Sequence, residues 1–188
     1  MITIADLHAS KQLIDDLSWP FDFDVRCAAT NNSWIKLDPE MPFVVIACDG
    51  TGGVFLAYGN GDTKNLPILH ATSEGQAGRM ASNLTEFLAV LMAVPHWQDL
   101  LKFSANGDLE EMRKTAVFIE RQYADDYLDL SNARQRITKL LPIPQIDDPI
   151  RMLHDSVHAT DCTLVADDGW RYESLFNKFK SSDNCNWK

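Results

Sequence analysis

The first half of the chain contains several apolar runs that are too short for helices. PFVVIACDG (42–50) is rich in valine and isoleucine, which favours a buried strand. GVFLAYG (53–59) and LPILHA (66–71) continue this pattern, and WIKL (34–37) precedes it. The links between the runs are too short for crossover helices, so the pattern predicts a meander of antiparallel strands.

Helical periodicity appears on both sides of this meander. ADLHASKQLIDDL (5–17) spaces its apolar residues as an opening helix does. After the strands, Asn83 is placed to cap a helix whose apolar stripe consists of Leu84, Phe87, Leu88, Leu91 and Met92. We expect this second helix to cover the sheet.

The second half of the chain is dominated by helical spacing. Apolar residues recur in steps of three and four between residues 108 and 141, which predicts one long helix or two. RMLHDSVHATDC (151–162) begins another helix, and residues 167–188 are expected to form a turn, an amphipathic final helix and a frayed tail. The order of elements predicts an α+β fold with an antiparallel or mixed sheet flanked by helices. We divide it into an α+β domain (1–101) and a helical extension packed on it (102–188).

The stretch CDGTGGVFLAYGNG (48–61) raises the possibility of a ligand-binding loop. A phosphate loop places its glycines between a strand and a helix, whereas Gly50, Gly52 and Gly53 lie between two predicted strands. Asp49, Asn60 and Asp62 lack the ligand spacing of an EF-hand, which excludes a calcium loop. We therefore interpret the glycines as turn residues and expect Gly52 and Gly53 to need a positive φ.

Charge limits the classes of partner. The chain has 27 acidic and 17 basic residues and a net charge of −10, which argues against binding nucleic acid through its phosphates. Residues 1–100 carry 12 acidic and 5 basic residues, so the acidity is concentrated in the predicted α+β domain.

Targeting and cysteine patterns indicate a compartment. The N-terminus shows no basic leader followed by an apolar run, and no apolar stretch is long enough to span a membrane, so we expect neither export nor membrane insertion. Cys27, Cys48, Cys162 and Cys185 lack CxxC spacing and are interpreted as free thiols. A cytoplasmic address follows from these two observations.

Only one segment carries residues typical of a metal site. His154, His158 and Cys162 recur every four residues, and imidazole and thiolate are zinc ligands. His154 and Cys162 would lie about 12 Å apart along a straight helix, which is too far to share one ion. The segment also lacks the HExxH pattern of zinc proteases. We expect no metal, no cofactor and no catalytic residue, since motifs such as GxSxG are missing too.

Two segments together resemble a known family. The strand, acidic glycine turn and strand from Val44 to Tyr58, and the helix start SNLTEFL from Ser82 to Leu88, are similar to the SUKH superfamily of Smi/Knr-like proteins. The resemblance covers residues 5 to 101. It implies an α+β binding protein with a curved antiparallel sheet and without enzymatic activity, of the kind that bacteria use as immunity proteins to neutralise a cognate toxin.

The charge independently suits a basic toxin. Toxins that act on nucleic acids, such as nucleases, are commonly basic, and an acidic inhibitor attracts them and competes with their substrate. The candidate partner-binding residues lie in predicted loops and are Asp22, Asp24, Trp34, Asp38, Glu40, Asp49 and Asp62. Two alternatives stay open: a regulatory protein–protein interaction module with a host partner, and a small zinc-binding protein.

Overall fold

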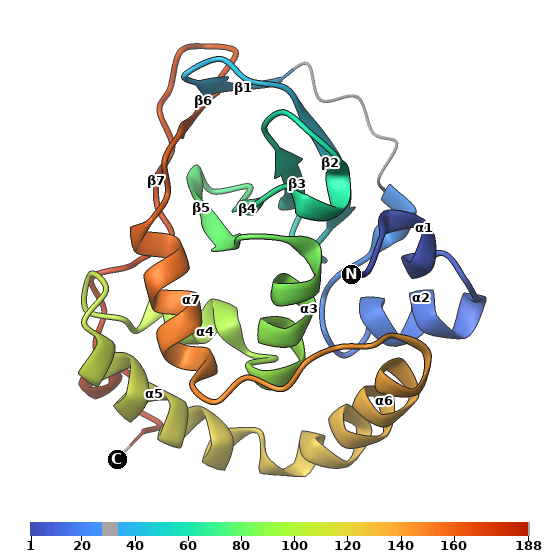
Figure 1. The fold of residues 1–188 in the computed structure, drawn as a ribbon. Helices are drawn as coiled ribbons and strands as arrows, with labels where there is room; N and C mark the ends of the chain where they lie inside the picture. Colours follow the sequence, from blue (N-terminus) through green and yellow to red (C-terminus); the bar gives the residue numbers. More distant parts are fainter. Residues whose placement is uncertain (28–33, 188) are drawn as a thin grey trace.

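The computed structural model describes residues 1–27 and 34–187, and its architecture confirms the predicted α+β class (Figure 1). Its helices are α1 (Ile4–Leu7), α2 (Lys11–Ser18), α3 (Leu84–Ala93), α4 (Trp97–Lys102), α5 (Leu109–Gln122), α6 (Tyr127–Leu140) and α7 (Pro149–His158). Its strands are β1 (Ile35–Asp38), β2 (Phe43–Cys48), β3 (Val54–Tyr58), β4 (Ile68–Ala71), β5 (Gln76–Ala81), β6 (Thr163–Ala166) and β7 (Glu173–Ser174).

The larger sheet has the strand order β2-β3-β4-β5-β7. Strands β2, β3 and β4 form the predicted antiparallel meander. Strand β5, where no strand was predicted, extends it antiparallel, and β7 joins β5 in parallel, so the sheet is mixed. The run at 34–37 does not belong to it. Instead β1 pairs antiparallel with β6 in a separate two-stranded sheet, with Ile35 opposite Ala166.

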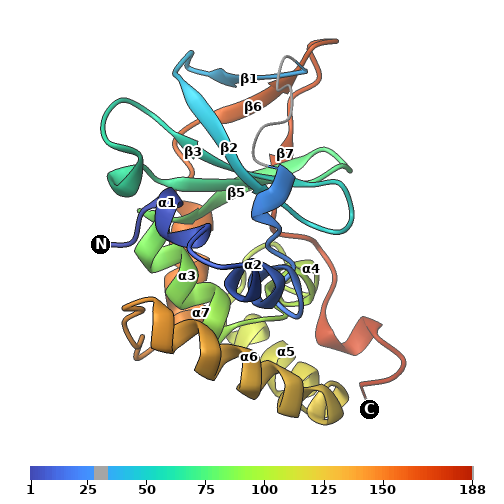
Figure 2. The same cartoon turned by 90° about the vertical axis from the view of Figure 1, so that its right-hand side faces the viewer.

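The larger sheet is covered on both faces, as Figure 2 shows, with the β1–β6 pair on one side and the helices on the other. Strand β3 is buried along its whole length. Phe55 and Ala57 face the main core beneath the helices, whereas Leu56 and Tyr58 face the smaller core beneath β1 and β6. Burial of both faces explains why this strand shows no polar alternation in the sequence.

Helix α3 begins after its predicted cap, Asn83. The Asn83 side chain accepts a hydrogen bond from the Glu86 backbone N–H at 3.0 Å, and Phe87 is fully buried in the main core. The periodic segment after residue 108 forms two helices, α5 and α6, separated by a 3₁₀ turn at residues 124–126. Asp16 of α2 and Arg136 of α6 form an ion pair at 2.6 Å, which attaches α6 to the N-terminal helices.

The C-terminal segment differs from the prediction. Residues 167–187 contain strand β7 and a short 3₁₀ turn (Ser181–Asp183) where we expected an amphipathic helix. The segment is extended instead, and Leu175 packs over Gly78 of β5. A Cβ added at Gly78 would lie 3.1 Å from the Leu175 side chain. The main core contains residues from Ile2 to Trp187, so it draws on both sides of residue 101.

The cysteine prediction is half wrong. Cys27 and Cys48 form a disulfide, with their Cα atoms 6.1 Å apart, whereas Cys162 and Cys185 are free. Disulfides persist mainly in oxidising compartments, so the cysteines do not support the expected cytoplasmic address. In the described ranges, every helix is too short or too polar to cross a bilayer.

Candidate functional site

A cleft of about 490 Å³ opens where several chain segments meet at one end of the larger sheet. Its walls come from the turn after β2, the turn after β4, helix α4 and residues 173–179. Four carboxylates line it (Asp49, which is buried, and Glu74, Asp99 and Glu173), and Lys102 is the single Lys or Arg among its described lining residues. The cleft is therefore acidic, and it combines these charges with apolar side chains that include Leu101, Leu175 and Phe179.

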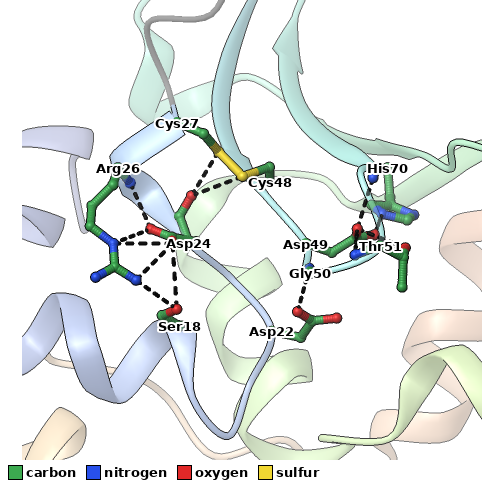
Figure 3. The surroundings of a disulfide bond; sticks show 11 residues. Ser18, Asp22, Asp24, Arg26, Cys27, Cys48, Asp49, Gly50, Thr51 and His70 are labelled. Atoms are coloured by element: carbon green, nitrogen blue, oxygen red, sulfur yellow. Dashed lines mark hydrogen bonds and ion pairs between the residues drawn. A yellow bond between two sulfur atoms is a disulfide. The ribbon is translucent and has the colours of Figure 1, made fainter.

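A buried ion pair forms one wall of the cleft. His70 Nε2 lies 2.9 Å from Asp49 Oδ2, and each side chain is 1% exposed. Asp49 Oδ1 accepts hydrogen bonds from the backbone N–H groups of Thr51 and Gly53, at 2.8 and 2.7 Å, and from the Thr51 hydroxyl (Figure 3). Burial by itself raises the pKa of the Asp49 carboxyl. The hydrogen bond and charge of His70, together with the other donors, outweigh burial and lower this pKa well below its usual value.

Strand geometry and close packing explain this pair. His70 lies on the helix-facing side of β4, and its ring contacts the rings of Phe55 and Trp97 at centroid distances of 4.5 and 4.8 Å. Gly53 has no room for a side chain, because a Cβ there would lie 2.4 Å from Asp49 Oδ2 and 2.9 Å from His70 Nε2. Gly52 has the predicted positive φ, +91°, whereas at Gly53 the reason for glycine is close approach.

Two buried polar atoms in the cleft wall have no protein partner among the described residues. They are His70 Nδ1 and the indole nitrogen Nε1 of Trp97. A buried donor or acceptor without a hydrogen bond costs about 1–3 kcal/mol. Both residues line the cleft, so its wall retains unused hydrogen-bonding capacity.

The hydroxyl groups of the cleft are engaged in turn structure. Ser73 Oγ donates to the Thr51 carbonyl at 3.0 Å, and Thr72 Oγ1 accepts from the Gln76 backbone N–H at 3.0 Å. His70 directs Nε2 at Asp49, which leaves only its buried Nδ1 for other chemistry. The arrangement can attract and hold cations, and its hydroxyls serve to shape the turns around the cleft.

The sequence-predicted acids near the disulfide are held by local contacts (Figure 3). Asp22, at φ 54°, accepts from the Gly50 backbone N–H at 2.7 Å and from Gln98 at 3.2 Å. Asp24 forms an ion pair with Arg26 at 2.7 Å, and hydrogen bonds from Arg26 lower the pKa of the Asp24 carboxyl. Both carboxylates help to anchor residues 22–26 beside the turn after β2.

The other predicted partner-binding residues are scattered. Asp49 is buried, so the expectation of an exposed loop acid is wrong there: its side chain turns inward to His70. Asp38 and Asp62 are exposed and paired, at 2.8 Å each, with Arg171 and Lys64. Exposed Glu40 lies just after β1, and half-buried Trp34 packs on the smaller core. Residues 31–33, which directly precede Trp34 in the sequence, lie outside the described ranges.

The weak metal candidates separate in the structure. The rings of His154 and His158 are adjacent at 4.4 Å on α7, and His154 Nε2 contacts the Gly107 carbonyl at 3.0 Å. Cys162 packs in the smaller core, where burial and the charge of Asp161 raise the pKa of its thiol to about 11. Within residues 1–27 and 34–187, no three His, Cys, Asp or Glu side chains are grouped to hold a metal ion.

Sequence reasoning missed the acidic residues of the cleft, Glu74, Asp99 and Glu173. They come from a turn, a short helix and a late segment, and a pattern in one stretch cannot show that such residues converge. A polar histidine in the middle of the apolar run LPILHA was the available signal. Comparison with protein-family models, with curated proteins and with solved structures finds no match for this chain.

Proposed function

We propose that this chain is a non-enzymatic binding protein that neutralises a cationic partner protein in the acidic cleft. The observation that carries the proposal is the set of cleft carboxylates Glu74, Asp99 and Glu173. None of them forms an ion pair with a described Lys, Arg or His, although they border one cleft. Unpaired like charges around a cleft repel one another, and an incoming cation relieves that repulsion.

The class of partner follows from the resemblance to SUKH immunity proteins, which we retain as part of the proposal. A bacterial toxin that acts on nucleic acid presents a basic surface to its substrate. A protein with a net charge of −10 attracts such a surface at long range and competes with the nucleic acid. Complex formation is therefore expected to weaken as salt concentration rises.

The proposed compartment is the cytoplasm, where an immunity protein would meet a toxin that attacks the cell's own nucleic acid. Thiols are kept reduced there, so this part of the proposal requires Cys27 and Cys48 to be reduced in growing cells. Alkylation of thiols in intact cells, followed by mass measurement, tests it. A chain recovered with this disulfide intact would contradict the cytoplasmic assignment.

A second candidate function is a regulatory module that binds a host protein through its helices. Trp19 is 76% exposed and lines a groove of about 380 Å³ together with Asp129 and Ala133 of α6. Leu128, on the same helix, is 72% exposed. Large apolar side chains exposed in this way are typical of protein-binding surfaces.

Co-expression separates the two candidates. The product of the gene immediately upstream would be expressed with and without this chain, and survival and co-purification would be scored. Rescue with a stable, salt-sensitive complex supports neutralisation of a toxin. If the upstream gene product is harmless and does not co-purify with this chain, toxin neutralisation loses its support and the regulatory module is favoured.

A further inference from the structure

We infer that the acidic cleft receives a long cationic side chain, arginine or lysine, presented by a peptide segment of the partner. This inference rests on the proposed function and specifies its ligand chemistry. The cleft volume, about 490 Å³, lies within the 300–1,000 Å³ range typical of ligand pockets. It exceeds what an inorganic cation would fill, so the shape and the charge together favour an extended organic cation.

The apolar part of the cleft suits the stem of such a side chain. Leu101 and Leu175 contribute aliphatic surface, and Phe179, which is 39% exposed, contributes an aromatic face. Lysine and arginine bury their methylene groups against apolar surface while their charged ends stay near polar groups. A guanidinium also stacks favourably on an aromatic ring.

The acidic part of the cleft suits the charged end. Glu74 and Glu173 come from adjacent backbone, because the Glu173 N–H donates to the Gly75 carbonyl at 2.8 Å. Asp99 projects from α4, where the Tyr123 hydroxyl donates to its carboxylate at 2.9 Å and fixes its orientation. The oriented Asp99 carboxylate and the exposed carboxylates of Glu74 and Glu173 are available for charge-assisted hydrogen bonds to an ammonium or guanidinium group.

The buried polar atoms favour a peptide-borne cation over a free amine. The Trp97 indole N–H can only donate, whereas His70 Nδ1 donates in the charged imidazole and accepts in the neutral one. The two side chains are 2% and 1% exposed and both line the cleft. A peptide segment brings a carbonyl acceptor and N–H donors together with its cationic side chain, and so matches both atoms.

Short capped peptides test this directly on the full chain. Three peptides would differ only at the central residue: arginine, lysine or the neutral arginine analogue citrulline. Binding would be followed by NMR of the ¹⁵N-labelled protein. We expect the arginine and lysine peptides to bind weakly, with a Kd of about 1 mM, and to shift the NMR signals of the Trp97 indole and the Gly75 amide. The citrulline peptide should bind at least about tenfold more weakly. Equal binding of all three peptides, or shifts confined to other surfaces, would overturn the inference.

A charge-matched pair of variants locates the interaction. The triple substitution Glu74→Gln, Asp99→Asn and Glu173→Gln removes three charges from the cleft. The control removes three charges from exposed positions elsewhere (Glu120→Gln, Asp125→Asn and Asp147→Asn). We expect at least about a tenfold loss of peptide binding in the cleft variant and less than about a twofold change in the control.

Folding and ligand source are checked in parallel. Melting temperatures of both variants would show whether lost binding reflects lost structure, and the single substitution Glu173→Gln gives a milder version of the cleft change. Free arginine and spermidine should bind more weakly than the peptides; equal affinity would identify a small cation as the ligand and contradict the peptide assignment. If the peptides fail while the co-expressed partner still forms a complex, this inference is wrong and the proposed function stands.

Discussion

Replacing Asp49 by alanine is predicted to destabilise the fold strongly, because this carboxylate connects the turn after β2 to β4. The substitution removes the acceptor of two buried donors, the Gly53 backbone N–H and His70 Nε2. Thr51 is exposed, so its donors can turn to water. At about 1–3 kcal/mol for each of the two buried groups, we expect a loss of about 2–6 kcal/mol, a range that contains the cost of breaking a buried ion pair, about 3–5 kcal/mol.

Urea unfolding, followed by tryptophan fluorescence, measures this loss. The transition midpoint should fall while the slope of free energy against urea stays constant, since the change affects stability rather than the surface exposed on unfolding. Asp62→Ala is the control: Asp62 and its partner Lys64 have side chains 55% and 39% exposed, so the loss there should be at most about 1 kcal/mol. A loss below about 1 kcal/mol for Asp49→Ala would refute the reasoning that the buried pair supports the turn.

Three further predictions concern the same region. Reducing the Cys27–Cys48 disulfide, which closes a separation of 21 residues, should lower the free energy of unfolding by about 3 kcal/mol; an unchanged urea midpoint in reductant would contradict this. Because the pKa of Asp49 is lowered from 3.8 in the fold, its stabilisation is present above that value and is lost as pH falls below it. Urea midpoints measured from about pH 6 to about pH 3 should therefore drop less in Asp49→Asn than in the unchanged chain. Gly53→Ala should destabilise the folded protein by more than about 2 kcal/mol, since its Cβ would overlap the Asp49 carboxylate. An unchanged melting temperature would contradict this and show that the turn can shift.

The parts of the fold that depend on local pattern could be predicted from the sequence. Short apolar runs with turn residues between them predicted β2, β3 and β4, and a polar cap followed by an apolar stripe predicted α3. These elements pair with or cover their neighbours along the chain, so the pattern in each stretch contains the needed information.

The remaining features depend on contacts between distant residues. Strand β1 pairs with β6, more than a hundred residues later, and β7 joins the sheet through two residues opposite Gln76 and Ala77. Neither pairing leaves a local signature. Extended backbone in residues 173–179 also replaced the expected helix, because tertiary packing of Leu175 over Gly78 outweighs its helical periodicity.

The candidate site was the least predictable part. Asp49 follows a strand and precedes glycine, which is typical of an exposed turn, yet its side chain folds inward because a histidine lies opposite on β4. The cleft acids are on three separated segments, and the pairing of Cys27 with Cys48 follows from the approach of residues 24–27 to the end of β2. Convergence of this kind is a property of the folded chain and not of any one stretch.

The most direct test of the central claim compares two sets of acids with equal charge in the co-expression experiment. One variant carries the three cleft substitutions at Glu74, Asp99 and Glu173, and the other replaces the sequence-predicted loop acids Asp38, Glu40 and Asp62 by their amides. We predict that the cleft variant loses the complex and the protection from the toxin, whereas the loop variant keeps both. Retention of the complex by the cleft variant, with loss in the loop variant, would contradict the account and place the binding surface on the loops.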